Sequence, residues 1–182
     1  MRILICFLAV SLAAFAQEAS KPNADNPVTS FNKMVNGQLK IWLLSSAEKM
    51  PEPNYSFKPA ETVRSFGQIL GHVADAQYMF CSDVLGEQVA PKNIEKTKTS
   101  KADLIAALNE SFLYCDKAYS GMTDMSGAQM MKFHGRDMAK FNALSANNMH
   151  LVEHYGNLVT YLRMKNIVPP SSETPPAPPE KK

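Results

Sequence analysis

Apolar side chains recur every three or four residues in four separate stretches of this 182-residue chain. Such spacing predicts amphipathic helices that each bury one face. The four predicted helices span residues 28–50, 60–85, 101–119 and 137–165. Prolines, glycines and polar residues lie between them, and these end helices and favour turns. No stretch alternates strictly between apolar and polar residues. The chain is therefore predicted to be all-α, and four long amphipathic helices are typical of a four-helix bundle.

The connections suggest how these helices are ordered. Pro59 is a suitable first residue for the second helix, because its fixed backbone angle fits that position. Residues 86–99 are rich in lysine and poor in apolar side chains, so they are predicted to connect two helices without forming an element. A helix over 60–85 would be about 39 Å long, and an extended connection could just run back along it. The second and third helices would then be parallel. Residues 121–135 are predicted to be a loop with at most one helical turn.

The N-terminal residues predict export. Arg2, a following apolar run to Phe15, and the small-x-small tripeptide Ala14-Phe15-Ala16 are typical of a signal peptide cleaved after residue 16. The mature protein is expected to be periplasmic or secreted, and no later stretch is apolar enough to anchor it in a membrane. We expect a disordered approach over 17–27, the folded bundle over 28–168 and a disordered proline-rich tail over 169–182.

Two cysteines, Cys81 and Cys115, remain in the expected mature chain, and an oxidising compartment would allow them to pair. If the second and third helices are parallel, the two residues differ by roughly 9 Å along the helix axis. An antiparallel pair would separate them by about 15 Å, which is beyond the reach of a disulfide. The parallel arrangement favours a disulfide, and the alternative is two small buried thiols.

The chain has four histidines, and three of them lie in apolar-periodic stretches. His150 and His154 are one helical turn apart and share a face, while His72 lies far upstream in the second predicted helix. Three imidazoles with one open position match the ligands of catalytic zinc sites. Imidazole also suits nickel, iron and copper, so the spacing predicts a divalent metal ion without naming it. His134 stands beside a glycine in the predicted loop and is expected to be a surface residue.

Three further polar residues are candidates for this site. Asp75 follows His72 by three residues and Asn147 precedes His150 by three, so each could share a face with a ligand and orient its ring. Either could instead be an ordinary solvated side chain. Tyr55, in the first interhelical loop, could border the open side of the site, or it could simply pack within the loop.

The same region also fits a protease motif. His150-x-x-Glu153-His154 matches the inverted zinc-protease pattern, in which the glutamate is the general base. Such enzymes need a further acidic ligand well downstream. Here the only downstream carboxylates, Glu173 and Glu180, lie in the proline-rich tail. The protease interpretation is therefore disfavoured.

Several of these segments together resemble a known family. They are Tyr55-Ser-Phe-Lys-Pro, Phe66-Gly-Gln-Ile-Leu-Gly-His72-Val-Ala-Asp75 and His150-Leu-Val-Glu-His154-Tyr-Gly-Asn-Leu-Val-Thr-Tyr-Leu-Arg163. With the Ile-Val-Pro-Pro that follows, they resemble the DinB-like metal-binding four-helix bundles over nearly the whole expected mature chain. The resemblance implies His72, His150 and His154 as ligands of a divalent metal (zinc, nickel or iron), with water in the remaining positions. It also implies up-down-down-up helix order with a long crossover between helices two and three.

Two classes of function stay open after this resemblance. Some DinB-like bundles resemble thiol-dependent transferases, and water bound to a metal would also suit a hydrolase. The alternative is a non-catalytic metal- or small-ligand-binding module of a stress or accessory kind. A small-molecule partner fits both classes, whereas the scattered basic residues behind the net charge of +2 do not suggest nucleic acid. The oligomeric state, including a homodimer, stays open.

Overall fold

The computed structural model describes residues 25–173. The predicted signal peptide over 1–16, most of the predicted approach segment and the tail from 174 onward lie outside the described residues. None of the described helices combines the length and the apolar character needed to cross a membrane.

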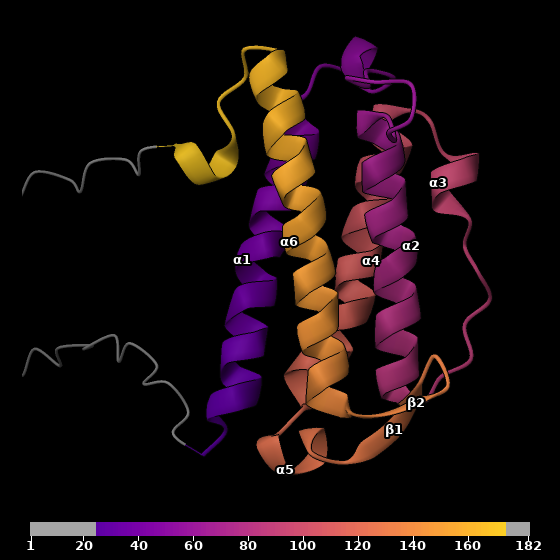
Figure 1. The fold of residues 1–182 in the computed structure, drawn as a ribbon, viewed down its shortest axis with the longest axis vertical. Helices are drawn as coiled ribbons and strands as arrows, with labels where there is room; N and C mark the ends of the chain where they lie inside the picture. Colours follow the sequence, from indigo (N-terminus) through magenta and orange to yellow (C-terminus); the bar gives the residue numbers. More distant parts are fainter. Residues whose placement is uncertain (1–24, 174–182) are drawn as a thin grey trace, which may run out of the picture.

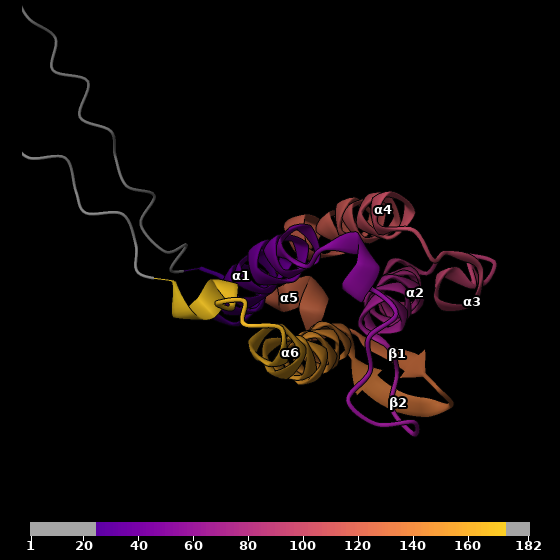
Figure 2. The same cartoon turned by 90° about the horizontal axis from the view of Figure 1, so that it is seen from above.

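Four long helices form the bundle (Figure 1). They are α1 (Pro27–Lys49), α2 (Phe66–Leu85), α4 (Lys101–Gly121) and α6 (Lys140–Met164). Figure 1 shows α1 and α6 running in one direction and α2 and α4 in the other. Both α2 and α1 pack against α4 and α6, so α1 and α2 occupy opposite corners, as the view from above shows (Figure 2). The all-α, up-down-down-up bundle with a crossover between its second and third long helices is confirmed.

The second long helix begins six residues later than predicted. Ser65 accepts a hydrogen bond from the backbone N–H of Gln68, and the Gln68 side chain accepts one from the backbone N–H of Ser65. This reciprocal capping box satisfies two otherwise unpaired donors at the helix start. Pro59 is therefore not the first helical residue, and the segment before Ser65 is irregular.

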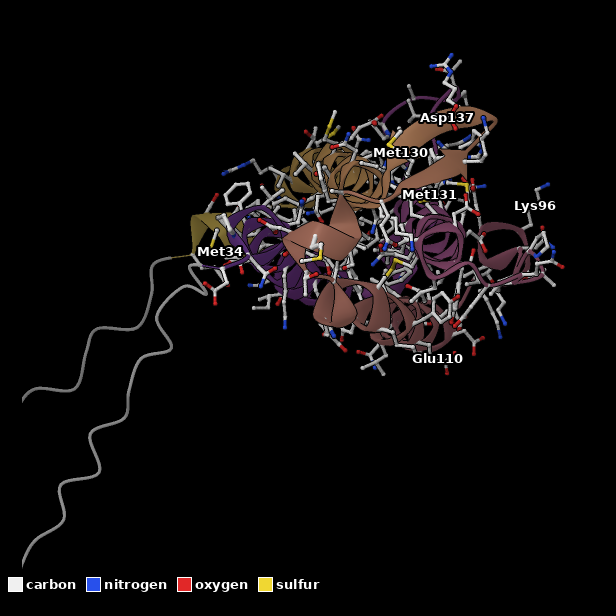
Figure 3. All side chains as sticks on the ribbon, turned by 90° about the horizontal axis from the view of Figure 1, so that it is seen from below. Met34, Lys96, Glu110, Met130, Met131 and Asp137 are labelled. Carbon is white, nitrogen blue, oxygen red and sulfur yellow. A yellow bond between two sulfur atoms is a disulfide. The ribbon has the colours of Figure 1, made fainter. Side chains whose placement is uncertain are left out.

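Two connections contain short elements, of which only a helical turn within residues 121–135 was predicted. The crossover carries a single helical turn, α3 (Ile94–Thr97), and the segment before α6 carries another, α5 (Asp124–Gly127). A β-hairpin follows α5, with β1 (Met130–Phe133) antiparallel to β2 (Arg136–Ala139). Figure 3 shows Met130, Met131 and Asp137 on this hairpin, at one end of the bundle. Because Asp137 lies in β2, the last helix begins at Lys140 and not near Asp137.

The two turn residues explain why a hairpin forms at this point of the chain. His134 and Gly135 both have positive φ angles, of 48° and 78°. A two-residue turn with both φ values positive matches the twist of the flanking strands. His134 is exposed at this turn, as expected for a surface residue. The 3-10 turns η1 (Glu52–Asn54) and η2 (Pro170–Ser172) complete the described elements.

The bundle core has two clusters of buried side chains. The larger contains Leu43, Phe66 and Leu70 and fills the end of the bundle where α2 begins. The smaller surrounds Cys81 and Cys115, which the structure joins as a disulfide with Cα atoms 5.3 Å apart. Cys81 is the sixteenth residue of α2 and Cys115 the fifteenth of α4, so parallel helices place the two cysteines at the same level. The expected 9 Å offset resulted from placing the start of α2 six residues too early.

Candidate metal centre

Three histidine side chains converge between α2 and α6. His72 projects from α2, and His150 and His154 project from α6. The Nε2 atom of His150 lies 3.1 Å from Nε2 of His72 and 3.0 Å from Nε2 of His154. One ring nitrogen from each residue lies within 4.8 Å of the other two. The structure therefore brings together the three residues that the sequence singled out.

Local structure places these rings. The four-residue spacing in α6 points two imidazoles to the same side of the helix, and α2 packs directly against α6. The ring of Phe80, two turns beyond His72 on α2, lies 5.8 Å from the ring of His150. His154 is 5% exposed. His72 and His150 are partly exposed. The site thus lies close to the surface, with the ring of Phe80 packed beside it.

The surroundings keep two of the imidazoles neutral. Burial lowers the pKa of His150 to about 4, and the neighbouring His154 and His72 act in the same direction. Burial also lowers the pKa of His154 to about 4, with His72 and the cationic Arg64 adding to the effect. Neutral imidazole is the form that binds metal ions. At neutral pH these two rings need not lose a proton before binding an ion.

Glu95, in the one-turn helix α3, provides a carboxylate that the sequence interpretation missed. Its Oε2 lies 3.2 Å from Nδ1 of His72, and its Oε1 accepts a hydrogen bond of 2.9 Å from Nε of Arg64. When a carboxylate accepts a hydrogen bond from Nδ1–H, the lone pair of that imidazole is on Nε2. This is the atom of His72 that faces His150.

Two residues of α2 hold α3 in place. Both carboxylate oxygens of Asp75 accept backbone hydrogen bonds, from the N–H of Ile94 at 2.9 Å and of Glu95 at 3.0 Å. A Cβ atom on Gly71 would lie 2.6 Å from Cα of Glu95, so only glycine permits this close approach. Of the two alternatives for Asp75, neither the contact with an imidazole nor the ordinary solvated side chain is correct. Asp75 instead positions the backbone of Glu95, which makes that contact.

Asn147 also differs from expectation. It is fully buried, and its Nδ2 donates to Oε1 of Gln77 at 2.6 Å and to the Tyr119 hydroxyl at 3.1 Å. The same nitrogen lies 3.9–4.0 Å from the sulfurs of Cys81 and Cys115. Asn147 thus joins a buried polar network beside the disulfide, because its side chain contacts residues of α2 and α4 and not His150.

Asn157 lies beside a histidine of the cluster, whereas Tyr55 does not. The amide nitrogen of Asn157 is placed 3.4 Å from Nδ1 of His154. Tyr55 is buried, and its hydroxyl donates to the carbonyl of Ala47 at 2.7 Å. Tyr55 therefore does not border the histidine cluster and instead packs the η1 loop onto the end of α1. Asn157, one turn further along α6, is the residue whose amide lies beside the His154 ring.

Two hollows lie beside the histidines, on either side of α6. A pocket of about 770 Å³ is lined by His154, Glu95, Asn157 and Arg64, with the irregular segment before α2 as its rim. A groove of about 1000 Å³ between α1 and α6 is lined mainly by apolar side chains, including Phe31 and Val152, and reaches His150. Glu153 is exposed and lines both hollows, so it does not point into the histidine cluster as a protease base would.

The fold and the site together define a four-helix bundle with a parallel crossover and a histidine triad between its second and last long helices. The chain belongs to the DinB superfamily, whose family model matches residues 43–158. The uncharacterized protein YjoA of Bacillus subtilis is 26% identical over 123 residues, which cover 64% of this chain and 77% of that protein.

Solved structures of DinB-like proteins share the fold. One from Bacillus cereus is 17% identical with a TM-score of 0.64, covering 72% of this chain and 89% of that one. The structure of YjoA from Bacillus subtilis is 21% identical with a TM-score of 0.61, covering 75% of this chain and 92% of that one. At these identities the similarity supports the bundle and does not assign an activity.

Proposed function

We propose that this protein binds a divalent metal ion through His72, His150 and His154 and uses it as a Lewis acid toward a small molecule. The convergence of three ring nitrogens within 4.8 Å carries this proposal. Tetrahedral coordination with metal–nitrogen bonds of about 2.1 Å places ligand nitrogens roughly 3.4 Å apart. The separations of 3.1 and 3.0 Å around His150 are close to that value, so small side-chain adjustments would accommodate an ion.

A small molecule in the pocket that His154 lines would lie beside an ion held by the three histidines. Bound there, a divalent ion would polarise a substrate oxygen or lower the pKa of a water molecule. The protein's own residues would set the conditions for this chemistry. Glu95 would hold His72 in the tautomer with a free Nε2, and the buried position of His154 would limit competing water. Zinc, nickel and iron all suit three imidazoles, so the ligand set leaves the metal open.

For the reaction, we propose a metal-dependent hydrolase or a thiol-dependent transferase. The polar pocket of about 770 Å³ beside the ion position is large enough for a small substrate and favours turnover over simple storage of an ion. Metal binding without turnover would instead make the protein a metal- or small-ligand-binding module.

We also propose that the protein is exported. The signal-like residues at the N-terminus motivate this proposal. A disulfide between Cys81 and Cys115 supports it, because such bonds persist mainly in oxidising compartments. N-terminal sequencing of the mature protein from fractionated cells would test it, and an intact N-terminus in the cytoplasmic fraction would contradict it.

Elemental analysis of purified protein tests the metal centre. We expect about one divalent ion per chain in wild-type protein and a large loss in His154→Asn, because three imidazoles and not two complete the ligand set. His134→Asn is the matched control, since this exposed histidine lies at the hairpin turn and asparagine tolerates its positive φ. The proposal would be overturned if His154→Asn kept its metal. It would also be overturned if wild-type protein supplied with zinc, nickel or iron contained no metal.

A panel of small esters and thiol acceptors tests catalysis separately. Metal-loaded wild-type protein should turn over at least one of them, and His154→Asn should not. Equal turnover by the two proteins would remove the catalytic interpretation while leaving metal binding to be judged by the elemental analysis.

A further inference from the structure

The pocket beside His154 has an unusual distribution of charge. Two of its lining side chains are cationic, Lys58 and Arg64, and three carry carboxylates, Glu61, Glu95 and Glu153. Lys58 pairs with Glu61 at 2.6 Å and Arg64 with Glu95 at 2.9 Å. The pocket alone thus has a formal charge of −1, and a divalent ion on the histidines would change it to +1. An ion would convert the pocket from one that repels anions to one that attracts them.

Arg64 is held at both its backbone and its side chain. The hydroxyl of Tyr161 donates to the Arg64 carbonyl at 2.6 Å, and Nε of Arg64 donates to Glu95. Within residues 25–173, the two terminal amino groups of Arg64 make no hydrogen bond, and the side chain is 44% exposed. A guanidinium fixed through Nε presents these two groups as a planar pair of donors, which suits a carboxylate.

Neutral polar side chains complete the wall. Asn157, Thr160 and Gln68 line the same pocket as Arg64 and His154. They can donate or accept hydrogen bonds without adding charge. A ligand in this pocket could therefore contact the guanidinium of Arg64, an ion held by the histidines, and neutral hydrogen-bonding side chains.

We propose that this pocket binds a small organic anion by two points, with its carboxylate on Arg64 and a second donor atom on the metal ion. This rests on the proposed metal binding by the three histidines. Arg64 is then a specificity-determining residue, which selects ligands by charge. Because ion and anion attract each other in the same pocket, each should raise the affinity of the other by the same factor.

Titration calorimetry with hydroxy acids of increasing length tests this inference. The probes are glycolate, 3-hydroxypropionate and 4-hydroxybutyrate, and the neutral controls are their amides. We expect zinc-loaded wild-type protein to bind at least one acid, with one chain length preferred, and to bind the corresponding amide at least tenfold more weakly. Metal-free protein should not bind the acids measurably. The preferred acid should also raise the apparent zinc affinity.

Variants then locate the carboxylate. At saturating zinc, Arg64→Gln should weaken binding of the preferred acid by roughly 10- to 100-fold, the range for charge-assisted hydrogen bonds. Arg64→Lys should recover only part of this affinity, because it restores the charge without the fork. Lys98→Gln removes an exposed positive charge outside this pocket. It should change the affinity for the preferred acid by less than about twofold.

The outcomes separate the two proposals. If wild-type protein takes up no divalent ion, both the metal centre and this inference fail. If it takes up zinc but binds acids no better than amides, or if Arg64→Gln binds the acid as well as wild type, the metal centre stands and the anion site is refuted.

Discussion

Glu95 reaches His72 from a part of the chain that belongs to none of the four bundle helices. Its Oε2 lies 3.2 Å from Nδ1 of His72, on the side of the ring opposite the nitrogen that faces His150. The crossover between α2 and α4 therefore does more than join two helices. It carries a carboxylate that would make His72 a better ligand by fixing its tautomer and increasing its basicity.

Replacing this carboxylate should weaken metal binding without removing a ligand. Glu95→Gln is expected to lower metal affinity by about 10- to 100-fold, the range found for groups that support a ligating histidine. Competition with a fluorescent chelator would measure the metal affinity of the variant and of wild-type protein. Glu110→Gln is the control, because Glu110 points outward from α4 on the far side of the bundle from the hairpin (Figure 3). An affinity equal to wild type in Glu95→Gln would show that the contact does not tune the site.

The close packing of α3 on α2 should make Gly71 intolerant of a side chain. A Cβ atom there would lie 2.6 Å from Cα and 2.9 Å from N of Glu95. Gly71→Ala should therefore displace α3 and destabilise the fold by about 1–3 kcal/mol, with a parallel loss of metal affinity. Urea unfolding and chelator competition would measure the two effects.

Gly37→Ala is the matched control for this substitution. Gly37 lies in the middle of α1 and is exposed, and a Cβ atom added to it would meet no atom within 4 Å. Alanine there should stabilise the protein by roughly 0.5–1 kcal/mol, because it restricts the unfolded chain and favours the helix. If Gly71→Ala were as stable as Gly37→Ala, the close packing of α3 would be refuted.

The disulfide between Cys81 and Cys115 should contribute substantially to stability. It closes a loop with a sequence separation of 34 residues. Loop-closure entropy for that length predicts a loss of about 3–4 kcal/mol in the free energy of unfolding of the Cys81→Ala, Cys115→Ala double variant. Denaturant unfolding would measure this loss. Two free thiols in the denatured, unreduced wild-type protein would contradict the bond itself.

Metal-free protein should lose stability as the pH falls below neutrality. The pKa values of His150 and His154 are lowered from 6.5 to about 4 by burial and by neighbouring cationic groups. Between pH 6.5 and 4 the unfolded chain therefore binds more protons at these positions than the folded chain does. Their contribution is complete above about pH 6.5 and is lost progressively as the pH falls toward 4.

Urea unfolding of chelator-treated protein at pH 7, 5.5 and 4.5 would measure this dependence. A His150→Gln, His154→Gln double variant should show a smaller loss over the same interval, because glutamine does not titrate. The same slope in both proteins would mean that these histidines do not cause the acid sensitivity.

The parts of this structure that periodicity could predict are those with long-range repetition. The four helices follow from regular apolar spacing over many residues. The parallel crossover follows from the length of the connection over 86–99, and the shared face of His150 and His154 from their four-residue spacing. The start of α2 was predictable in principle, since Ser65 and Gln68 have capping-box spacing. Pro59 offered a competing start, and local preference alone could not decide between them.

The hairpin and the role of Glu95 could not be predicted in the same way. Each strand has only four residues, too few for alternation to stand out, and the turn at His134 and Gly135 was the main local signal. Glu95 lies among lysines in a stretch that resembles a solvated connection. Its place beside His72 depends on Gly71 and Asp75, which contact α3 only after the chain has folded back.

The position of Glu95 on a one-turn helix has a consequence for how this bundle can vary. Bundle helices are constrained on several sides by their neighbours, so changing a buried side chain there disturbs the packing around it. The crossover contacts mainly one face of α2, through α3. Ile94 of this turn belongs to the core, but Glu95 is only partly buried. Substituting Glu95 could alter which ion the histidines prefer, or how strongly they hold it, while the interior stays unchanged. The segment that joins two helices would thus be the place where evolution, or a protein engineer, could diversify the chemistry of this scaffold with the least disturbance to its fold.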